Sequence, residues 1–357
     1  MAHEEPVLTA RAGRTARVTL NRPRALNALT HPMVLRVAEA LTAWERDESV
    51  AAVVVDGAGD RGLCAGGDIR AIHRDARTGG GASAPFWRDE YRLNARIARY
   101  PKPYVALMDG IVMGGGVGVS AHGDVRVVTE RSAVAMPETG IGLVPDVGGT
   151  WLLTRAPGAL GTHLALTGRA AGAADALLCG LADHYVPADR LPALRAALAD
   201  DRVRDGADVR ATVRRYASAP PAGQLAADRA WIDACYAAGT VEEIVDRLLG
   251  HGEPAAKEAA ETILGRSPTA LKATLAALRR AARLNTLEEA LDWEYRASCA
   301  ALDTPDLLEG IRAQVIDKDR APRWSPGELE RVTEADVACF SAPPPGGDLG
   351  LSPVSRN

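Results

Sequence analysis

Short apolar runs alternate with amphipathic stretches through the first half of the chain. Residues 50–56 (VAAVVVD) form a compact, β-branched run, which predicts a strand buried on both faces. Residues 32–47 instead predict a helix, because apolar residues recur there at helical spacing: Val34, Leu35, Val37, Ala38 and Leu41. The same reasoning predicts further strands at residues 16–20, 104–108 and 125–129, and further helices at residues 85–99 and 115–122. Strand and helix therefore alternate, as in an α/β fold whose helices cover a sheet.

The pattern changes near residue 188. From there to about residue 304 apolar residues recur at helical spacing and strand-like alternation is absent. This predicts helices over residues 191–198, 209–216, 225–238, 241–249, 254–264, 269–283 and 287–301. We therefore expect an α/β core over residues 1–188 and a helical C-terminal region over residues 189–341. Residues 342–357 are rich in Pro, Gly and Ser, which predicts a disordered tail.

Composition narrows the classes of protein. The 357 residues are 47% hydrophobic and 25% charged with a formal net charge of −4, which gives no field that would attract nucleic acid or an anionic membrane. The first residues lack the features of a secretory signal, and no apolar run is long enough to span a membrane. The five cysteines are scattered without a CxxC pair, which argues against a disulfide framework and a zinc site. We expect a cytoplasmic protein without a metal.

Two glycine-rich turns lie upstream of two carboxylates. The first is CAGGD, which contains Gly66 and Gly67, and the second is the run from Gly114 to Gly116. Without side chains, such turns let a ligand approach bare backbone N–H groups, which can stabilise an oxyanion. Tight turning and close packing of a helix explain the same glycines without any ligand, so each turn alone is a weak signal.

The carboxylates are Glu138, which follows Met-Pro, and Asp146 in PDVGG. A single acidic residue in a loop is most often a solvated surface group or a helix cap. The neighbouring Ile141, Leu143 and Val144 are apolar and indicate that this loop is partly buried. A buried carboxyl tends to have a raised pKa, which makes both residues candidate acids or bases.

Together these segments resemble the crotonase (enoyl-CoA hydratase/isomerase) superfamily over nearly the whole chain. The similar blocks are TLNRPRALNALT, CAGGDI, PKPYVALMDGIVMGGGVG, MPETGIGLVPDVGG, LALTGR, SPTALKATL and DKDRAPRW. The later blocks resemble the branch whose members hydrolyse 3-hydroxyisobutyryl-CoA. The resemblance implies a crotonase-type spiral of ββα units, an acyl-CoA substrate and no separate cofactor, since coenzyme A is part of the substrate. It also implies a possible homo-oligomer.

The resemblance assigns roles to individual residues. The family's two oxyanion donors fall on the N–H groups of Gly67 and Gly115, with Gly66 and Gly114 beside them against the substrate. Hydratases carry a glutamate three residues after the middle glycine, where this chain has Gly118. Adding water across a double bond uses two carboxylates around one water, so this departure weighs against hydration.

The hydrolase pattern pairs Glu138 with Asp146 and places a substrate-contacting glutamate at Glu90. It implies that a short 3-hydroxyacyl-CoA thioester is hydrolysed, as in valine breakdown, with Glu138 acting as nucleophile or as general base. Two alternatives stay open at this point. One is an enoyl-CoA hydratase or isomerase acting on another acyl-CoA, and the other is a crotonase-like binding protein without catalysis.

Overall fold

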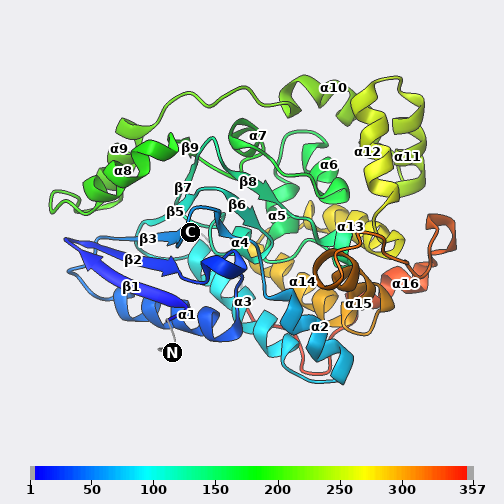
Figure 1. Ribbon diagram of the computed structural model, residues 1–357, viewed down its shortest axis with the longest axis horizontal. Helices are drawn as coiled ribbons and strands as arrows, with labels where there is room; N and C mark the ends of the chain where they lie inside the picture. Colours follow the sequence, from blue (N-terminus) through cyan, green and yellow to red (C-terminus); the bar gives the residue numbers. More distant parts are fainter. Residues whose placement is uncertain (1–4, 352–357) are drawn as a thin grey trace. The chain divides into compact units, whose positions relative to one another are not determined.

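The computed structural model describes residues 5–351 (Figure 1). The chain divides into two compact units, each built from several segments. Unit 1 comprises Met1–Gly67, Leu93–Val134 and Ala171–Gly223, and unit 2 comprises Asp68–Arg92, Ala135–Ala170 and Gln224–Asn357. Compact units need not coincide with domains, so the predicted boundaries at residues 188 and 341 stay predictions.

A six-stranded sheet with the order β1-β2-β3-β5-β7-β9 forms the centre of unit 1 (Figure 1). Its strands are β1 (Val7–Ala12), β2 (Thr15–Leu20), β3 (Ala52–Gly57), β5 (Tyr104–Met108), β7 (Val125–Val128) and β9 (His184–Tyr185). Only the β1–β2 pair is antiparallel among the described strands of this sheet; the other pairs are parallel. Parallel pairs need crossover segments, which explains the alternation of strand and helix in the sequence.

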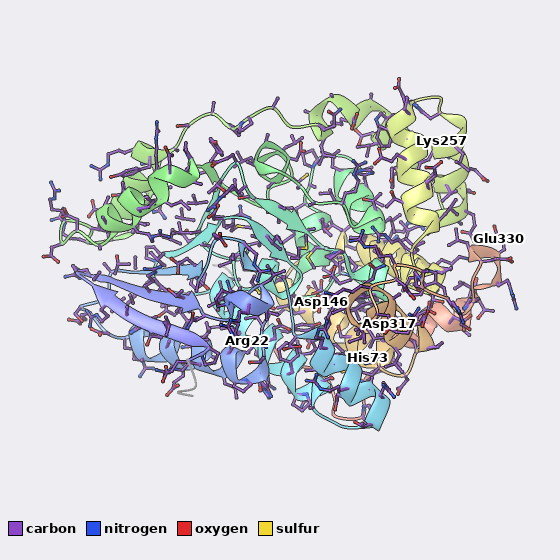
Figure 2. The ribbon with its side chains drawn as sticks, in the orientation of Figure 1. Arg22, His73, Asp146, Lys257, Asp317 and Glu330 are labelled. Atoms are coloured by element: carbon purple, nitrogen blue, oxygen red, sulfur yellow. The ribbon has the colours of Figure 1, made fainter. Side chains whose placement is uncertain are left out.

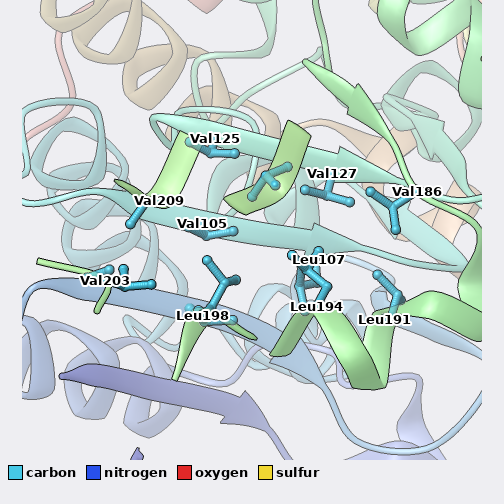
Figure 3. Packing of buried hydrophobic residues seen from close by; sticks show 13 residues of the cluster. Val105, Leu107, Val125, Val127, Val186, Leu191, Leu194, Leu198, Val203 and Val209 are labelled. Carbon is cyan, nitrogen blue, oxygen red and sulfur yellow. The ribbon is translucent and has the colours of Figure 1, made fainter. Parts of the chain in front are cut away.

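One hydrophobic cluster of unit 1 lies against one face of this sheet (Figure 3). Alternate residues of β3, β5 and β7 point into it, because successive side chains of a strand face opposite sides. Helices α8 (Leu191–Leu198) and α9 (Gly206–Tyr216) supply the apolar side chains that cover them. The remaining helices of this unit are α1 (His31–Glu45), α4 (Gly115–Gly118), α7 (Ala173–Leu178), η1 (Pro23–Ala25) and η3 (Ala188–Arg190).

A second, three-stranded sheet has the order β4-β6-β8. Its strands are β4 (Gly62–Cys64), β6 (Ile111–Met113) and β8 (Ala133–Ala135). The parallel pairing of β4 with β6 sets Cys64 opposite Val112. Each glycine-rich turn follows one of these two paired strands, so the pairing brings the turns together.

Unit 2 is mainly helical. Its elements are α2 (Ile69–Thr78), the first part of α3 (Ser83–Ala98), η2 (Glu138–Ile141), α5 (Gly149–Leu153), α6 (Leu160–Thr167), α10 (Leu225–Tyr236), α11 (Val241–Gly250), α12 (Pro254–Leu264), α13 (Pro268–Ala281), α14 (Leu287–Ala301), α15 (Pro305–Ile311), the π-helical η4 (Arg312–Ile316), η5 (Leu329–Arg331), α16 (Glu334–Ala338) and η6 (Cys339–Ser341). Helix α14 packs against α5 and η6. It thereby reaches the segment that follows Asp146.

Much of the predicted element pattern is confirmed, with local differences. The predicted strand 104–108 and the predicted helices 191–198, 254–264 and 287–301 have the observed bounds. In α1, Met33 and Ala40 belong to the buried face, whereas Leu35 is 49% exposed. Among residues 5–351, no helix combines the length and apolar character that crossing a bilayer requires, and no three His, Cys, Asp or Glu side chains are grouped to hold a metal ion.

The described part of the predicted disordered tail is held by side chains of unit 2. Arg92 donates to the carbonyl of Leu349, whose own N–H donates to Asp292. Arg296 forms a two-pronged ion pair with Asp348, and the Leu349 side chain is buried. Asp348 and Leu349 therefore have defined partners, whereas residues 352–357 lie outside the described residues.

Candidate active site

The two glycine-rich turns of unit 1 lie directly against each other. A Cβ atom on Gly66 would lie 3.3 Å from the carbonyl oxygen of Met113 and 3.7 Å from the backbone nitrogen of Gly115. A Cβ on Gly116 would lie 2.3 Å from the carbonyl oxygen of Cys64. Only glycine fits at this approach, because the backbones occupy the space of a side chain.

The backbone leaves the predicted oxyanion donors outside the local hydrogen bonds. Gly67 forms a parallel bridge with Leu29, but its bond runs from the N–H of Leu29 to the carbonyl of Gly66. Gly114 has φ +48° and precedes α4, whose first residue is Gly115. The first N–H groups of a helix have no acceptor within it. Both donors that the resemblance assigns thus belong to adjacent turns of one unit.

Glu138 is a buried carboxyl in unit 2. It begins η2, directly after β8 and Pro137, and is only 5% exposed. Its Oε2 atom is buried and has no hydrogen-bond partner. Burial, followed by the charge of Asp146, raises its pKa well above the usual range. These findings contradict the interpretation of Glu138 as a solvated surface group. They fit an acid or base whose free oxygen can contact a ligand.

Asp146, labelled in Figure 2, is also buried, at 6% exposure. Its Oδ2 atom accepts a hydrogen bond of 2.6 Å from the hydroxyl of Tyr91. Burial raises the pKa of Asp146 to about 6, although the Tyr91 hydrogen bond opposes the rise. The residue does not cap α5 with its side chain: the N-cap is Gly148, and the carbonyl of Asp146 accepts from the N–H of Gly149.

Glu90 is the third predicted carboxylate and lies on α3. It is 2% exposed, and its Oε1 atom is buried without a hydrogen-bond partner. Burial, and then the charge of Asp146, raises its pKa well above the usual range. Glu90 and Glu138 therefore each have a buried carboxyl oxygen without a hydrogen-bond partner. Such an oxygen costs stability unless a ligand supplies the partner.

A fourth buried carboxyl, Glu294 on α14, was not predicted. It accepts hydrogen bonds from the N–H of Gly148 (2.5 Å) and from the N–H (2.9 Å) and hydroxyl (2.5 Å) of Thr150. Burial raises its pKa to about 8 against the effect of these bonds. One turn later, Ser298 contacts the hydroxyl of Tyr91 at 2.7 Å. Both polar residues interrupt the apolar stripe of an amphipathic helix, the one sequence signal that points to them.

The segment between Asp146 and Gly148 contains a strained residue. Val147 is fully buried and has φ +53°, a left-handed conformation that a β-branched side chain rarely adopts. Strain of this kind costs about 1–3 kcal/mol and persists only where surrounding contacts enforce it. This strained residue directly follows Asp146, a predicted catalytic carboxylate.

Comparisons with known proteins identify the family of this chain. The sequence profile of the enoyl-CoA hydratase/isomerase family matches residues 15–340. A relative from Danio rerio, named 3-hydroxyisobutyryl-CoA hydrolase, mitochondrial, is 43% identical over 345 residues that cover 94% of this chain and 89% of the relative. The Homo sapiens protein of the same name is 40% identical over 341 residues, covering 93% and 87%.

Solved structures with other names share the fold. A carnitinyl-CoA dehydratase from Mycobacterium thermoresistibile has a TM-score of 0.92 and 54% identity, covering 96% of this chain and 98% of that one. An enoyl-CoA hydratase from Rhodobacter sphaeroides 2.4.1 has a TM-score of 0.90 and 46% identity, covering 97% and 100%. The expected α/β crotonase fold is confirmed, and the chain belongs to the enoyl-CoA hydratase/isomerase family, the crotonase superfamily.

Proposed function

We propose that the protein hydrolyses the thioester of a short 3-hydroxyacyl-CoA, with 3-hydroxyisobutyryl-CoA as substrate and a place in valine breakdown. The observation that carries the proposal is the buried Oε2 of Glu138, which has no hydrogen-bond partner, while burial and then the charge of Asp146 raise the pKa of the same carboxyl. The curated relatives named 3-hydroxyisobutyryl-CoA hydrolase support the choice of substrate.

Glu138 can promote hydrolysis of the thioester by either of two routes. As general base, Glu138 takes a proton from water while the water oxygen bonds to the thioester carbon. As nucleophile, its oxygen bonds to that carbon and gives a mixed anhydride, which water then hydrolyses. In both routes the C–S bond breaks and the CoA sulfur leaves. Asp146 donates a proton to the departing sulfur and regains one from the water, through Glu138 in the general-base route, because a carboxyl with a pKa of about 6 both donates and accepts near neutral pH.

The developing oxyanion is assigned, on the family resemblance, to the N–H groups of Gly67 and Gly115. Removing one such donor costs about 10²–10³-fold in kcat in enzymes with an oxyanion hole. The 3-hydroxyl of the acyl group is assigned to Glu90, whose unpartnered Oε1 lacks a hydrogen bond that a hydroxyl could supply.

A second candidate is hydration of an enoyl-CoA or the reverse dehydration. The observation in its favour is the 54% identity to the structure named carnitinyl-CoA dehydratase. Gly118 weighs against it, since the hydratase glutamate expected there is missing.

One set of assays separates these candidates. Thiol release from 3-hydroxyisobutyryl-CoA is measured for wild type, for Glu138→Gln and for the control Glu328→Gln, which changes an exposed glutamate. Crotonyl-CoA hydration is measured on the same samples. We expect release by wild type and control, and a loss of at least about 10²-fold in Glu138→Gln. Hydration without thiol release would contradict the proposal and favour the second candidate. No turnover in either assay would favour a binding protein.

A further inference from the structure

Helix α14 carries two fully buried polar side chains, of which one contacts the loop that carries Asp146 and the other contacts Tyr91, the hydrogen-bond donor to Asp146. Glu294 and Ser298 are both 0% exposed and lie four residues apart, on one face of the helix. They belong to the stripe that also includes Leu287, Leu291 and Ala301. Polar groups in such a stripe are costly unless each has a partner, and both have partners next to Asp146.

Glu294 fixes the backbone that follows Asp146. Its carboxylate accepts from the N–H of Gly148 and from the N–H and hydroxyl of Thr150. Val147, whose φ is +53°, lies between Asp146 and Gly148. A change in its φ would move Gly148 relative to Asp146, so the hydrogen bond from Gly148 to Glu294 helps to hold this segment in place.

Ser298 acts on the side chain of Asp146 through Tyr91. The hydroxyl of Tyr91 has one hydrogen, which it donates to Asp146 over 2.6 Å. The contact of 2.7 Å between Tyr91 and Ser298 must then use the hydrogen of Ser298. The hydrogen bonds consequently run in one direction, from Ser298 to Tyr91 to Asp146.

We propose that Glu294 and Ser298 are positioning residues for the carboxyl of Asp146. Glu294 holds the backbone that follows Asp146, and Ser298 holds its side chain through Tyr91. This deepens the proposed function, on which it rests for the catalytic role of Asp146. Neither residue needs to touch the substrate.

The first test compares kinetics across matched variants. Thr150→Val and Ser298→Ala each remove one hydroxyl from this network, whereas Thr150→Ser keeps the hydroxyl. The control Thr274→Val removes an equally buried hydroxyl that has no partner. We expect Thr150→Val and Ser298→Ala to lower kcat by about 10–100-fold with KM nearly unchanged, because small misplacements of reacting groups have effects of this size. Thr150→Ser should retain most of the activity and Thr274→Val all of it.

The second test does not require activity. The titration of Asp146 is followed by carboxyl ¹³C NMR in wild type, Tyr91→Phe and Ser298→Ala, with Asp146→Asn for assignment. The groups that face Asp146 are Glu90 and Tyr91 on α3, Glu138 on η2 and Glu294 on α14. Losing the Tyr91 hydrogen bond should raise the pKa of Asp146, since that bond stabilises the carboxylate. Ser298→Ala should shift it in the same direction.

The outcomes separate this proposal from the proposed function. If wild type releases no thiol but both NMR shifts appear, the function is wrong and the positioning role stands. If wild type is active while Ser298→Ala and Thr150→Val match Thr274→Val in kcat, and Ser298→Ala matches wild type in the titration of Asp146, the positioning role is overturned. A loss of kcat that only follows the loss of folded protein, with the titration unchanged, also overturns it.

Discussion

Replacing Gly116 with alanine should slow thioester hydrolysis, although the residue contacts no reacting atom. The new Cβ would lie 2.3 Å from the carbonyl oxygen of Cys64, and ordinary contact begins near 3.4 Å, so the two turns must separate by about 1 Å. That separation moves the N–H of Gly115 away from that of Gly67. Misplacement by about 1 Å can cost about 10²-fold in rate, and overpacking costs about 1–3 kcal/mol of stability.

The assay measures initial rates of thiol release over a range of 3-hydroxyisobutyryl-CoA concentrations, together with a thermal melt followed by circular dichroism. The matched control is Gly172→Ala, which lies in the same unit, has φ −71° and would place its Cβ in open space. We expect a folded Gly116→Ala protein with a lower melting temperature and kcat reduced by about 10²-fold. A folded variant whose kcat equals that of Gly172→Ala would refute the reasoning.

Other changes test the remaining features. Glu90→Leu should raise the melting temperature, because it removes a buried oxygen without a partner, and should reduce the preference in kcat/KM for 3-hydroxyisobutyryl-CoA over isobutyryl-CoA by about tenfold or more. The free energy of unfolding should fall as pH rises from about 4 to 8, since burial raises the pKa of Asp146 to about 6 and that of Glu294 to about 8, so that the folded state binds protons that the unfolded chain releases. Melting temperatures across this range would show it, and Asp146→Asn should flatten the part below about pH 6; a pH-independent melt would contradict it. Gly250→Ala should stabilise by about 0.5–1 kcal/mol in urea unfolding, because the exposed helical position has open space for a Cβ. Leu349→Ala should destabilise by about 2–5 kcal/mol in the same measurement, since the side chain is 1% exposed; an unchanged midpoint would show that the segment contributes nothing.

The sequence predicts best where an element has a strong apolar signal. The strand Tyr104–Met108 is an apolar run buried at every position, the helix Leu287–Ala301 has helical spacing, and both are found with their predicted bounds. Strand β1 escapes prediction because only Val7 is buried in it, which leaves no alternation to detect. The short strands β4, β6 and β8 escape because three residues are too few to establish a period.

Some residues of the candidate site could be predicted from the sequence and others could not. Glu138 and Asp146 lie within one motif that the resemblance identifies, and the structure buries both. Glu294 is more than 140 positions away from Gly148 and Thr150, and Ser298 is 207 positions away from Tyr91, so no local pattern connects either residue to its partners. Composition likewise cannot show that Asp348 has a partner in Arg296 within a segment rich in Pro and Gly.

The anchored segment near the C-terminus changes how a late stop codon should be interpreted. A chain that ended after Ser341 would keep every carboxylate of the candidate site. It would nevertheless lose the partners that Arg296 and Asp292 have in Asp348 and Leu349, on the helix that carries Glu294. Such an allele would behave like a missense change within α14, and a gene shortened by so few codons should not be counted as intact.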